Sequence, residues 1–272
     1  MYEDIIILAI IVIVVTIIVY LIIRSSNVSN NDSFLAMPAD GKFSFPIYII
    51  NLERKPERYQ YVKQQLDNMG LTNYQRWLGV DGFKTDKEDI LKVGISEDLY
   101  NKGKGLAGCA ASHAQVWKHL VDTKADWTLI LEDDANFHPH FLQLFTKYWQ
   151  QVPTRAKIVY VGHCCGEEEE KKSKTSIIET GVMCNHGYML SWVGAKYLLD
   201  NLTPLKDPVD IDIVEHFRHR PGSFIFNGNN MVEGIRPNDY KESNGRKCMF
   251  NGIIYQNQEE QGSTIHGVNT VF

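Results

Sequence analysis

The chain has 272 residues, a formal net charge of -5, a pI of about 6.0 and a hydrophobic fraction of 44%. This length accommodates one globular domain with a sizeable core and an additional segment. The acidic balance argues against a nucleic-acid-binding protein, which needs a basic face to neutralise phosphates. Five cysteines without a C-x-x-C pair are too few for a disulfide scaffold, so we expect core cysteines and at most one or two bridges.

The N-terminal segment is the most apolar part of the chain. From Ile5 to Ile23 it carries no charged residue and consists mainly of Ile, Val, Leu and Ala. A helix of about 20 residues rises roughly 30 Å, enough to cross the hydrocarbon core of a bilayer. The first four residues are acidic at Glu3 and Asp4, whereas a cleaved signal peptide normally begins with basic residues. The sequence therefore predicts an uncleaved, single-pass membrane anchor over residues 1–24.

Two signals disagree on which side of the membrane the rest of the chain lies. Arg24 follows the apolar span, and the positive-inside rule then favours a cytoplasmic domain. Glycosylation sequons that begin at Asn27, Asn31 and Asn201 favour the opposite side. The sequence leaves the topology open. Residues 25–44 are rich in Ser, Asn, Asp and Gly, which predicts a linker or stem.

From residue 45 onward, short apolar strands alternate with helices. Such alternation predicts an α/β domain with a mostly parallel central sheet over residues 45–272. The section between residues 82 and 108 is rich in loop residues, and the charged run 167–174 reads as a solvated loop. The expected strands are 45–52, 74–80, 127–131, 158–161 and 188–191, and the expected helices are 55–69, 109–124, 141–149 and 195–201.

Three consecutive carboxylates, Glu132, Asp133 and Asp134, come directly after an apolar strand. In an open α/β sheet, ligands bind beyond the carboxyl ends of the strands. Adjacent carboxylates repel one another unless a cation compensates, and Mg²⁺ or Mn²⁺ prefers oxygen ligands with substrate phosphates completing the shell. The alternative is that the acids cap the next turn. The residues alone are balanced between the two, and the buried strand in front favours a metal site.

Two arginines follow the first strand. Arg54 and Arg58 are one helical turn apart and could both face a phosphate near a helix N-terminus. Surface salt bridges with Glu53 and Glu57 are the simpler alternative, and without further context they are preferred.

Several short motifs occur along the chain in a characteristic order. They are LxRxxxR from Leu52, WxxVDG from Trp77, GCxxSHxxxW from Gly108, LILEDD from Leu129, YMLSxxGA from Tyr188, PVD from Pro208, and Gln258 followed by SxI from Ser263. In order and spacing these motifs resemble glycosyltransferase family 25, over roughly residues 47–265. That family includes bacterial lipooligosaccharide transferases and the procollagen hydroxylysine galactosyltransferases.

The resemblance implies a GT-A-type, Rossmann-like fold, a divalent cation (Mn²⁺ or Mg²⁺), a UDP-hexose donor and inversion at the anomeric carbon. It places metal ligands at Glu132 and Asp134, with Asp134 favoured for direct contact. For His113, packing against Trp117 is an equal alternative. The expected donor-binding residues are Arg54, Arg58, Asp81, Ser112, His113 and Asp133.

An inverting transfer needs a base beside the attacking hydroxyl of the acceptor. Asp210 matches the family position and is the candidate, with a helix N-cap as the structural alternative. Asp212 is the second choice. His186 and His266 are weaker candidates for contacts with a diphosphate or a metal, and the polar lead-in at residues 184–185 counts against His186.

The sequence thus predicts a membrane-anchored glycosyltransferase that moves a hexose, such as galactose or glucose, from a UDP-sugar. Its acceptor would be a glycan, a lipid-linked sugar or a hydroxylysine-type protein hydroxyl, with lipopolysaccharide biosynthesis as one setting. The alternative is a non-catalytic, membrane-tethered carbohydrate-binding protein on a degenerate transferase fold, against which the acidic triplet counts. A nuclease or phosphotransferase is disfavoured by the acidic charge and the lack of a Gly-rich P-loop.

Overall fold

The computed structural model describes residues 33–38, 40–164, 174–227, 240–243 and 246–256. All of these residues except Ser33 belong to one compact unit, Phe34–Phe272. The predicted anchor, the sequons at Asn27 and Asn31, the C-terminal motif from Gln258, His266 and almost all of the charged run lie outside the described residues. Within the described ranges, no helix is both long and apolar enough to cross a membrane.

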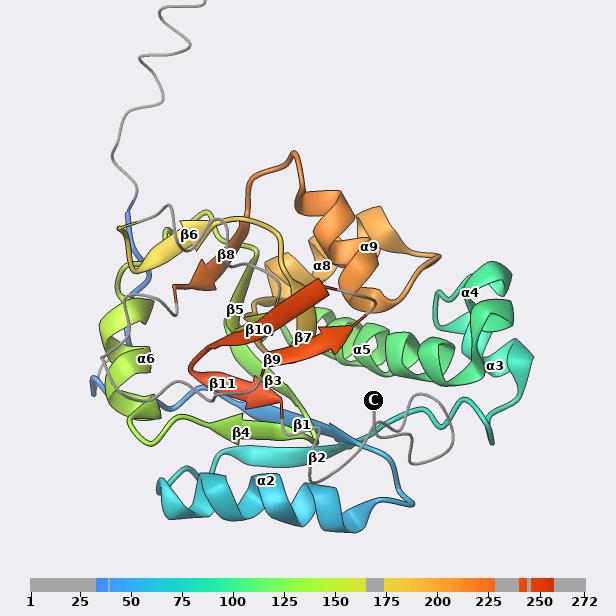
Figure 1. Ribbon diagram of the computed structural model, residues 1–272, viewed down its shortest axis with the longest axis horizontal. Helices are drawn as coiled ribbons and strands as arrows, with labels where there is room; N and C mark the ends of the chain where they lie inside the picture. Colours follow the sequence, from blue (N-terminus) through green and yellow to red (C-terminus); the bar gives the residue numbers. More distant parts are fainter. Residues whose placement is uncertain (1–32, 39, 165–173, 228–239, 244–245, 257–272) are drawn as a thin grey trace, which may run out of the picture. The chain divides into compact units, whose positions relative to one another are not determined.

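A mixed sheet of nine strands forms the centre of the described structure (Figure 1). At one end, β2, β1 and β3 are parallel neighbours. Next, β7 runs antiparallel between β3 and β5, and β8 lies parallel to β5. The predicted α/β class is confirmed, with the antiparallel strand β7 separating two parallel groups. The strands are β1 (Ile47–Asn51), β2 (Tyr74–Leu78), β3 (Thr128–Glu132), β4 (Ala135–Phe137), β5 (Ile158–Cys164), β6 (Ile177–Glu179), β7 (Met183–Leu190), β8 (Ser223–Phe226), β9 (Tyr240–Ser243), β10 (Arg246–Gly252) and β11 (Ile254–Gln256).

Helices cover both faces of the sheet, and each face has its own hydrophobic core. Ile49 and Leu131 face α2 and α6, while Tyr48 and Ile130 face α5, α8 and α9. Burial on both faces explains why the central strands are continuous apolar runs. The helices are α2 (Pro56–Asn68), α3 (Lys87–Lys92), α4 (Glu97–Lys102), α5 (Lys104–Thr123), α6 (Phe141–Trp149), α8 (Trp192–Leu202) and α9 (Val209–Phe217).

The described residues of the predicted linker, from Phe34 to residue 44, pack onto this domain. The backbone N–H of Leu35 donates to the carbonyl of Val152, and the indole of Trp149 donates to the carbonyl of Ala36. The Phe43 ring is buried against the aromatic rings of α6. Apolar residues interspersed in this polar segment therefore anchor it to the core.

The expected elements between residues 45 and 202 are present, with shifted ends. Helix α5 begins at Lys104 instead of residue 109, and the section expected to be loops contains α3 and α4. A disulfide joins Cys164 on β5 to Cys184 on β7, within the predicted one or two bridges, and Cys109 is a free thiol.

Candidate functional site

A cleft opens where β1, β2 and β3 end. The strands are in register there, because Ile50 lies beside Glu132 and Asn51 beside Leu78. This is the carboxyl edge at which α/β sheets bind ligands. The structure brings all the predicted donor-binding and metal-binding residues to this cleft: Arg54, Arg58, Asp81, Ser112, His113, Glu132, Asp133 and Asp134.

On one side of the cleft, which we call the Arg58 side, two carboxylates share one cation. The guanidinium of Arg58 lies 2.6 Å from Asp133 Oδ1 and 3.3 Å from Asp134 Oδ2. Asn51 donates from Nδ2 to Asp133 Oδ2 at 2.6 Å. All four side chains are buried. Neither expectation for Arg58, a free phosphate ligand or a surface salt bridge, describes this buried pairing with the acidic triplet.

The charge of Asp133 is strongly affected by burial. Burial raises the pKa of Asp133 to about 7, and Asp134 and Glu132 add to the rise, while Arg58 and Asn51 oppose it. The desolvation penalty thus outweighs the ion pair. Asp133 therefore holds Arg58 and the strand ends together, and its oxygens are already bonded to Asn51 and Arg58.

Asp134 differs from Asp133 because one of its carboxylate oxygens has no hydrogen-bond partner in the described structure. Its Oδ2 accepts a hydrogen bond from Gln256 Nε2 at 3.0 Å, and Gln256 arrives from β11. Its Oδ1 is buried and has no hydrogen-bond partner within the described part of the chain. Leaving a buried carboxylate oxygen without a donor is costly, and a bound cation satisfies it.

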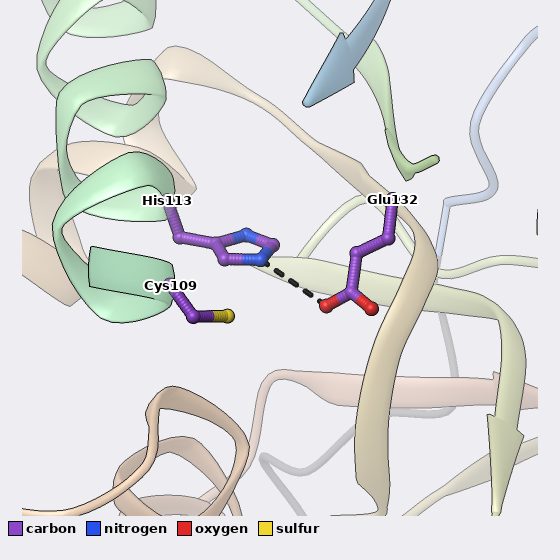
Figure 2. A group of neighbouring side chains, drawn as sticks. All are labelled: Cys109, His113 and Glu132. Atoms are coloured by element: carbon purple, nitrogen blue, oxygen red, sulfur yellow. Dashed lines mark hydrogen bonds and ion pairs between the residues drawn. The ribbon is translucent and has the colours of Figure 1, made fainter. Parts of the chain in front are cut away.

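The opposite side of the cleft, which we call the α5 side, consists of Cys109, His113 and Glu132 (Figure 2). His113 is buried, and its Nε2 lies 3.3 Å from Glu132 Oε1. Its Nδ1 lies 2.8 Å from the hydroxyl of Tyr188, which also accepts the indole N–H of Trp117. With Glu132 ionised, His113 donates through Nε2 and accepts the Tyr188 proton at Nδ1. His113 thus joins the site to the core and is not only packed against Trp117.

The α5 side has excess negative charge. Burial raises the pKa of Glu132, as do the charges of Asp134 and Asp210, while the hydrogen bond from His113 lowers it. Burial and the neighbouring carboxylates also raise the pKa of the Cys109 thiol well above its usual value. In the ion pairs of the described residues, Glu132 has no lysine or arginine partner.

The rim of the cleft is formed by the loop after β2 and by α5. Asp81 Oδ2 accepts from Arg54 Nε at 2.7 Å, so Arg54 is bound to Asp81 and not to Glu53. Ser112 accepts from the Val80 N–H at 2.8 Å and donates to the Gly108 carbonyl, so its hydroxyl fixes the loop to α5. A Cβ on Gly108 would come within 2.5 Å of the Val80 carbonyl oxygen, which explains the glycine.

Asp210, the predicted base, is not among the residues that line the cleft. It lies in the first turn of α9, whose N-cap is Pro208, and its charge contributes to the raised pKa of Glu132. Its Oδ2 accepts from the Cys184 N–H at 3.2 Å. Asp212, the second candidate base, accepts from the backbone N–H groups of Lys206 and Asp207. Among the described residues no side-chain hydrogen bond caps α9, so the capping role considered for Asp210 is not observed, and Asp212 stabilises the turn before the helix.

His186 lies in the core. It is fully buried, its Nε2 lies 3.0 Å from the carbonyl oxygen of Ile254, and it is not among the residues that line the cleft. Burial lowers the pKa of His186 to about 4, so the ring is neutral at ordinary pH and donates to the carbonyl. This contact fixes β11 beside β7.

Four cleft residues with a polar, thiol or aromatic side chain were not predicted as site residues. Asn51 ends a parallel strand, and Cys109 stands four residues before His113, so both carried a usable signal. Phe83, 49% exposed, and Gln256 also line the cleft. Gln256 reaches the site through the pairing of β11 with β4, which has no local signature.

Open α/β proteins, nucleotide-binding ones among them, bind their ligands beyond the carboxyl edge of the sheet, which is where this cleft lies. Comparison with known proteins narrows this class. The family model described as "Glycosyltransferase family 25 (LPS biosynthesis protein)" matches residues 45–213. The chain belongs to glycosyltransferase family 25.

Its relatives agree with this assignment. A glycosyltransferase 25 family member of Aedes aegypti is 29% identical over 190 residues, 65% of this chain and 31% of the relative. A putative glycosyltransferase of Acanthamoeba polyphaga mimivirus is 27% identical over 168 residues, 57% of this chain and 52% of the relative. Procollagen galactosyltransferase 1-A of Xenopus laevis is 24% identical over 202 residues, 67% of this chain and 33% of the relative. The chain thus spans from about a third to half of the length of these relatives.

Proposed function

We propose that this protein is a glycosyltransferase with a GT-A-like domain that moves a hexose from a UDP-sugar to a hydroxyl acceptor with inversion. The observation that carries the proposal is the acidic triplet at the carboxyl edge, with Asp134 Oδ1 buried and lacking a donor among the described residues. Family membership supports transfer of a sugar. Relatives named procollagen galactosyltransferases make a hydroxyl on a collagen-like chain one candidate acceptor.

The residues fit a divalent cation. Asp134 offers a buried oxygen with no partner in the described structure, and Glu132 offers a half-buried carboxylate without a lysine or arginine beside it. These two would hold Mn²⁺ or Mg²⁺, which prefers oxygen ligands. When bound, the cation supplies positive charge that stabilises a departing diphosphate. Arg58 and Asn51 hold Asp133 and Asp134 in place for this role.

The rim supplies the remaining donor contacts. Arg54 is fixed by Asp81, and a planar guanidinium suits a phosphate oxygen. Phe83, beside Asp81, presents an exposed aromatic ring on which a nucleobase can stack. Together they would orient the nucleotide so that its diphosphate points to the acidic triplet.

Asp210 is the proposed base. Hydrogen bonds from the Cys184 and Ile211 N–H groups orient its carboxylate. It would take the proton of the acceptor hydroxyl while that oxygen bonds to the anomeric carbon and the diphosphate leaves. We expect Asp210→Asn to lower kcat by roughly 100- to 10,000-fold, the usual contribution of a general base. Asp212→Asn is the matched control, and an equal loss in both variants would reassign the effect to the structure of α9.

The anchor remains part of the proposal, with the domain in an oxidising compartment. The Cys164–Cys184 disulfide supports this side, because such bonds persist in oxidising surroundings. Asn201, in the third sequon, is exposed at the end of α8. Treating the protein from cells with an endoglycosidase should change its mass, and Asn201→Gln should reduce that change. An unglycosylated chain in a glycosylating host would contradict this topology.

The experiment that tests the function is a transfer assay on the full-length chain, with several UDP-hexoses and Mn²⁺. Asp134→Ala should lower transfer by about 1000-fold, since metal stabilisation is worth several kcal/mol. Asp200→Ala, an exposed acid paired with Lys196 on α8, is the control and should retain activity. Full activity in Asp134→Ala would reject the cation site. A wild-type chain that binds donor but transfers nothing would favour the non-catalytic carbohydrate-binding alternative.

A further inference from the structure

Cys109, His113 and Glu132 gather three different ligand types on the α5 side. Cys109 and His113 are four residues apart on α5, so both project from the same face of the helix. Figure 2 shows both side chains directed toward Glu132 at the end of β3. One ligand atom from each residue lies within 4.8 Å of the other two.

We propose that Cys109, His113 and Glu132 bind a zinc-class transition-metal ion, with a fourth position open to the cleft. A thiolate, an imidazole and a carboxylate are the ligand types of zinc, and three protein ligands leave one position open. Mg²⁺ and Mn²⁺ select oxygen ligands, whereas a thiolate selects softer ions. On binding, the Cys109 thiol releases its proton to solvent as the metal–sulfur bond forms.

The surroundings of His113 are those of a metal ligand. A metal-binding histidine usually bonds its second ring nitrogen to a fixed partner, which sets the ring orientation. Here Nδ1 lies 2.8 Å from the Tyr188 hydroxyl, which Trp117 holds in place. With a cation at Nε2, the ring proton resides on Nδ1 and is donated to the Tyr188 oxygen. The buried tyrosine thus serves the ring with or without a metal.

Charge also favours a cation beside Glu132. Arg58 already compensates Asp133 and Asp134. The ion pairs of the described residues give Glu132 only His113. A divalent ion balances one thiolate and one carboxylate. The proposed site rests on the positions and charges of these three residues and does not depend on transfer activity.

Cobalt provides the test, because Co²⁺ can replace zinc and its absorption spectrum reports the ligands that bind it. Co²⁺ added to the metal-free full-length chain should produce the near-ultraviolet sulfur-to-cobalt charge-transfer band. Cys248→Ser should retain the band, and Cys109→Ser should lose it. Zinc affinity can be measured by competition with a chromophoric chelator. It should fall in Cys109→Ser by at least roughly 10- to 100-fold, because the loss of an outer-shell partner alone costs that much. No band in the wild type, or an undiminished band in Cys109→Ser, would overturn the site.

A second measurement needs no variant, should Cys109→Ser fail to fold. Alkylation of Cys109 in the wild-type chain, followed by mass spectrometry, should slow when Zn²⁺ is present and recover when a chelator removes it. Mg²⁺ should give little protection. Equal alkylation rates with and without Zn²⁺ would reject the site.

One consequence rests on the proposed function. Glu132 would serve both the zinc-class ion and the hard cation, so the two should compete. Zn²⁺ should then inhibit transfer in the presence of Mn²⁺, and Cys109→Ser should shift inhibition to higher Zn²⁺, with each variant compared to its own zinc-free rate. The cobalt band is measured without donor or acceptor, and transfer is measured without zinc. A wild-type chain can therefore fail either test without failing the other, so the two proposals fail separately.

Discussion

The two sides of the acidic triplet are stabilised in different ways, although their carboxylates are consecutive in sequence. On the Arg58 side, Asp133 and Asp134 share a buried guanidinium. On the α5 side, Glu132 meets a histidine and a thiol and has no lysine or arginine partner in the described ion pairs. Asp134 also has one oxygen that Arg58 does not reach: its Oδ1 is buried and has no donor in the described structure. The Arg58 side is therefore rigid, while Asp134 Oδ1 and the α5 side are available to a ligand.

The largest expected effect on stability comes from Arg58. Arg58→Met would leave Asp133 and Asp134 buried without a cation, which typically costs about 3–5 kcal/mol. We expect that loss in the free energy of unfolding by urea. A change below about 1 kcal/mol would mean that water reaches these carboxylates and that the Arg58 side is not the rigid one.

The pH dependence of stability distinguishes the two sides next. Because burial raises the pKa of Asp133 to about 7, folding favours its protonated form. This contribution is fully present below the unfolded pKa and is lost as pH rises through about 7. At about 1.4 kcal/mol per pKa unit, the loss is at most about 4 kcal/mol. Asp133→Asn should flatten the slope between pH 4 and 8, measured as urea unfolding at each pH. A wild-type stability that rises across that interval, or an unchanged slope in the variant, would contradict the assignment.

A smaller effect is expected on the α5 side. Tyr188→Phe removes the hydroxyl that serves both Trp117 and His113, so two buried groups lose a partner. The cost of such a change is about 1–3 kcal/mol, measurable by thermal unfolding. Tyr197 is the control, because its hydroxyl bonds only to His216 among the hydrogen bonds of the described residues. Tyr197→Phe should therefore cost less. Equal effects would show that Tyr188 does not organise this side.

The smallest effect is expected at the rim. Arg54 and Asp81 form a partly exposed pair at the rim, and ion pairs in contact with solvent contribute roughly 0–1 kcal/mol. Arg54→Met should therefore barely change unfolding, yet it should weaken the binding of UDP. If it destabilised the fold as much as Arg58→Met, the rim would be structural and not part of the donor site.

Local patterns predicted the parallel half of the molecule well. The apolar runs of β1, β3 and β5 and the periodicity of α5 were clear. The rule that ligands bind at the carboxyl edge singled out the acidic triplet, and the family resemblance added Asp81, which lines the same cleft. The missed elements are short or depend on distant pairing. Strands β8 and β11 have four and three residues, and α3 and α4 have six each.

Which residues form the cleft was easier to predict than which of them contact one another. Arg58 reaches the triplet only because α2 packs beneath β1, and Gln256 only because β11 pairs with β4. Such partners are set by tertiary packing, and short-range spacing does not encode them. The Cys109–His113 spacing was visible, but its meaning depended on Glu132 arriving at the same point.

Calorimetry of UDP binding to the full-length chain tests the central claim most directly. The claim is that Glu132 and Asp134 hold a divalent cation against a nucleoside diphosphate. Wild-type protein should bind UDP with Mn²⁺ and at least tenfold more weakly, a difference of about 1.4 kcal/mol, without it. Asp134→Ala should bind equally weakly in both conditions. UDP binding of equal strength with and without Mn²⁺ in the wild type, or an unchanged Mn²⁺ effect in Asp134→Ala, would contradict it.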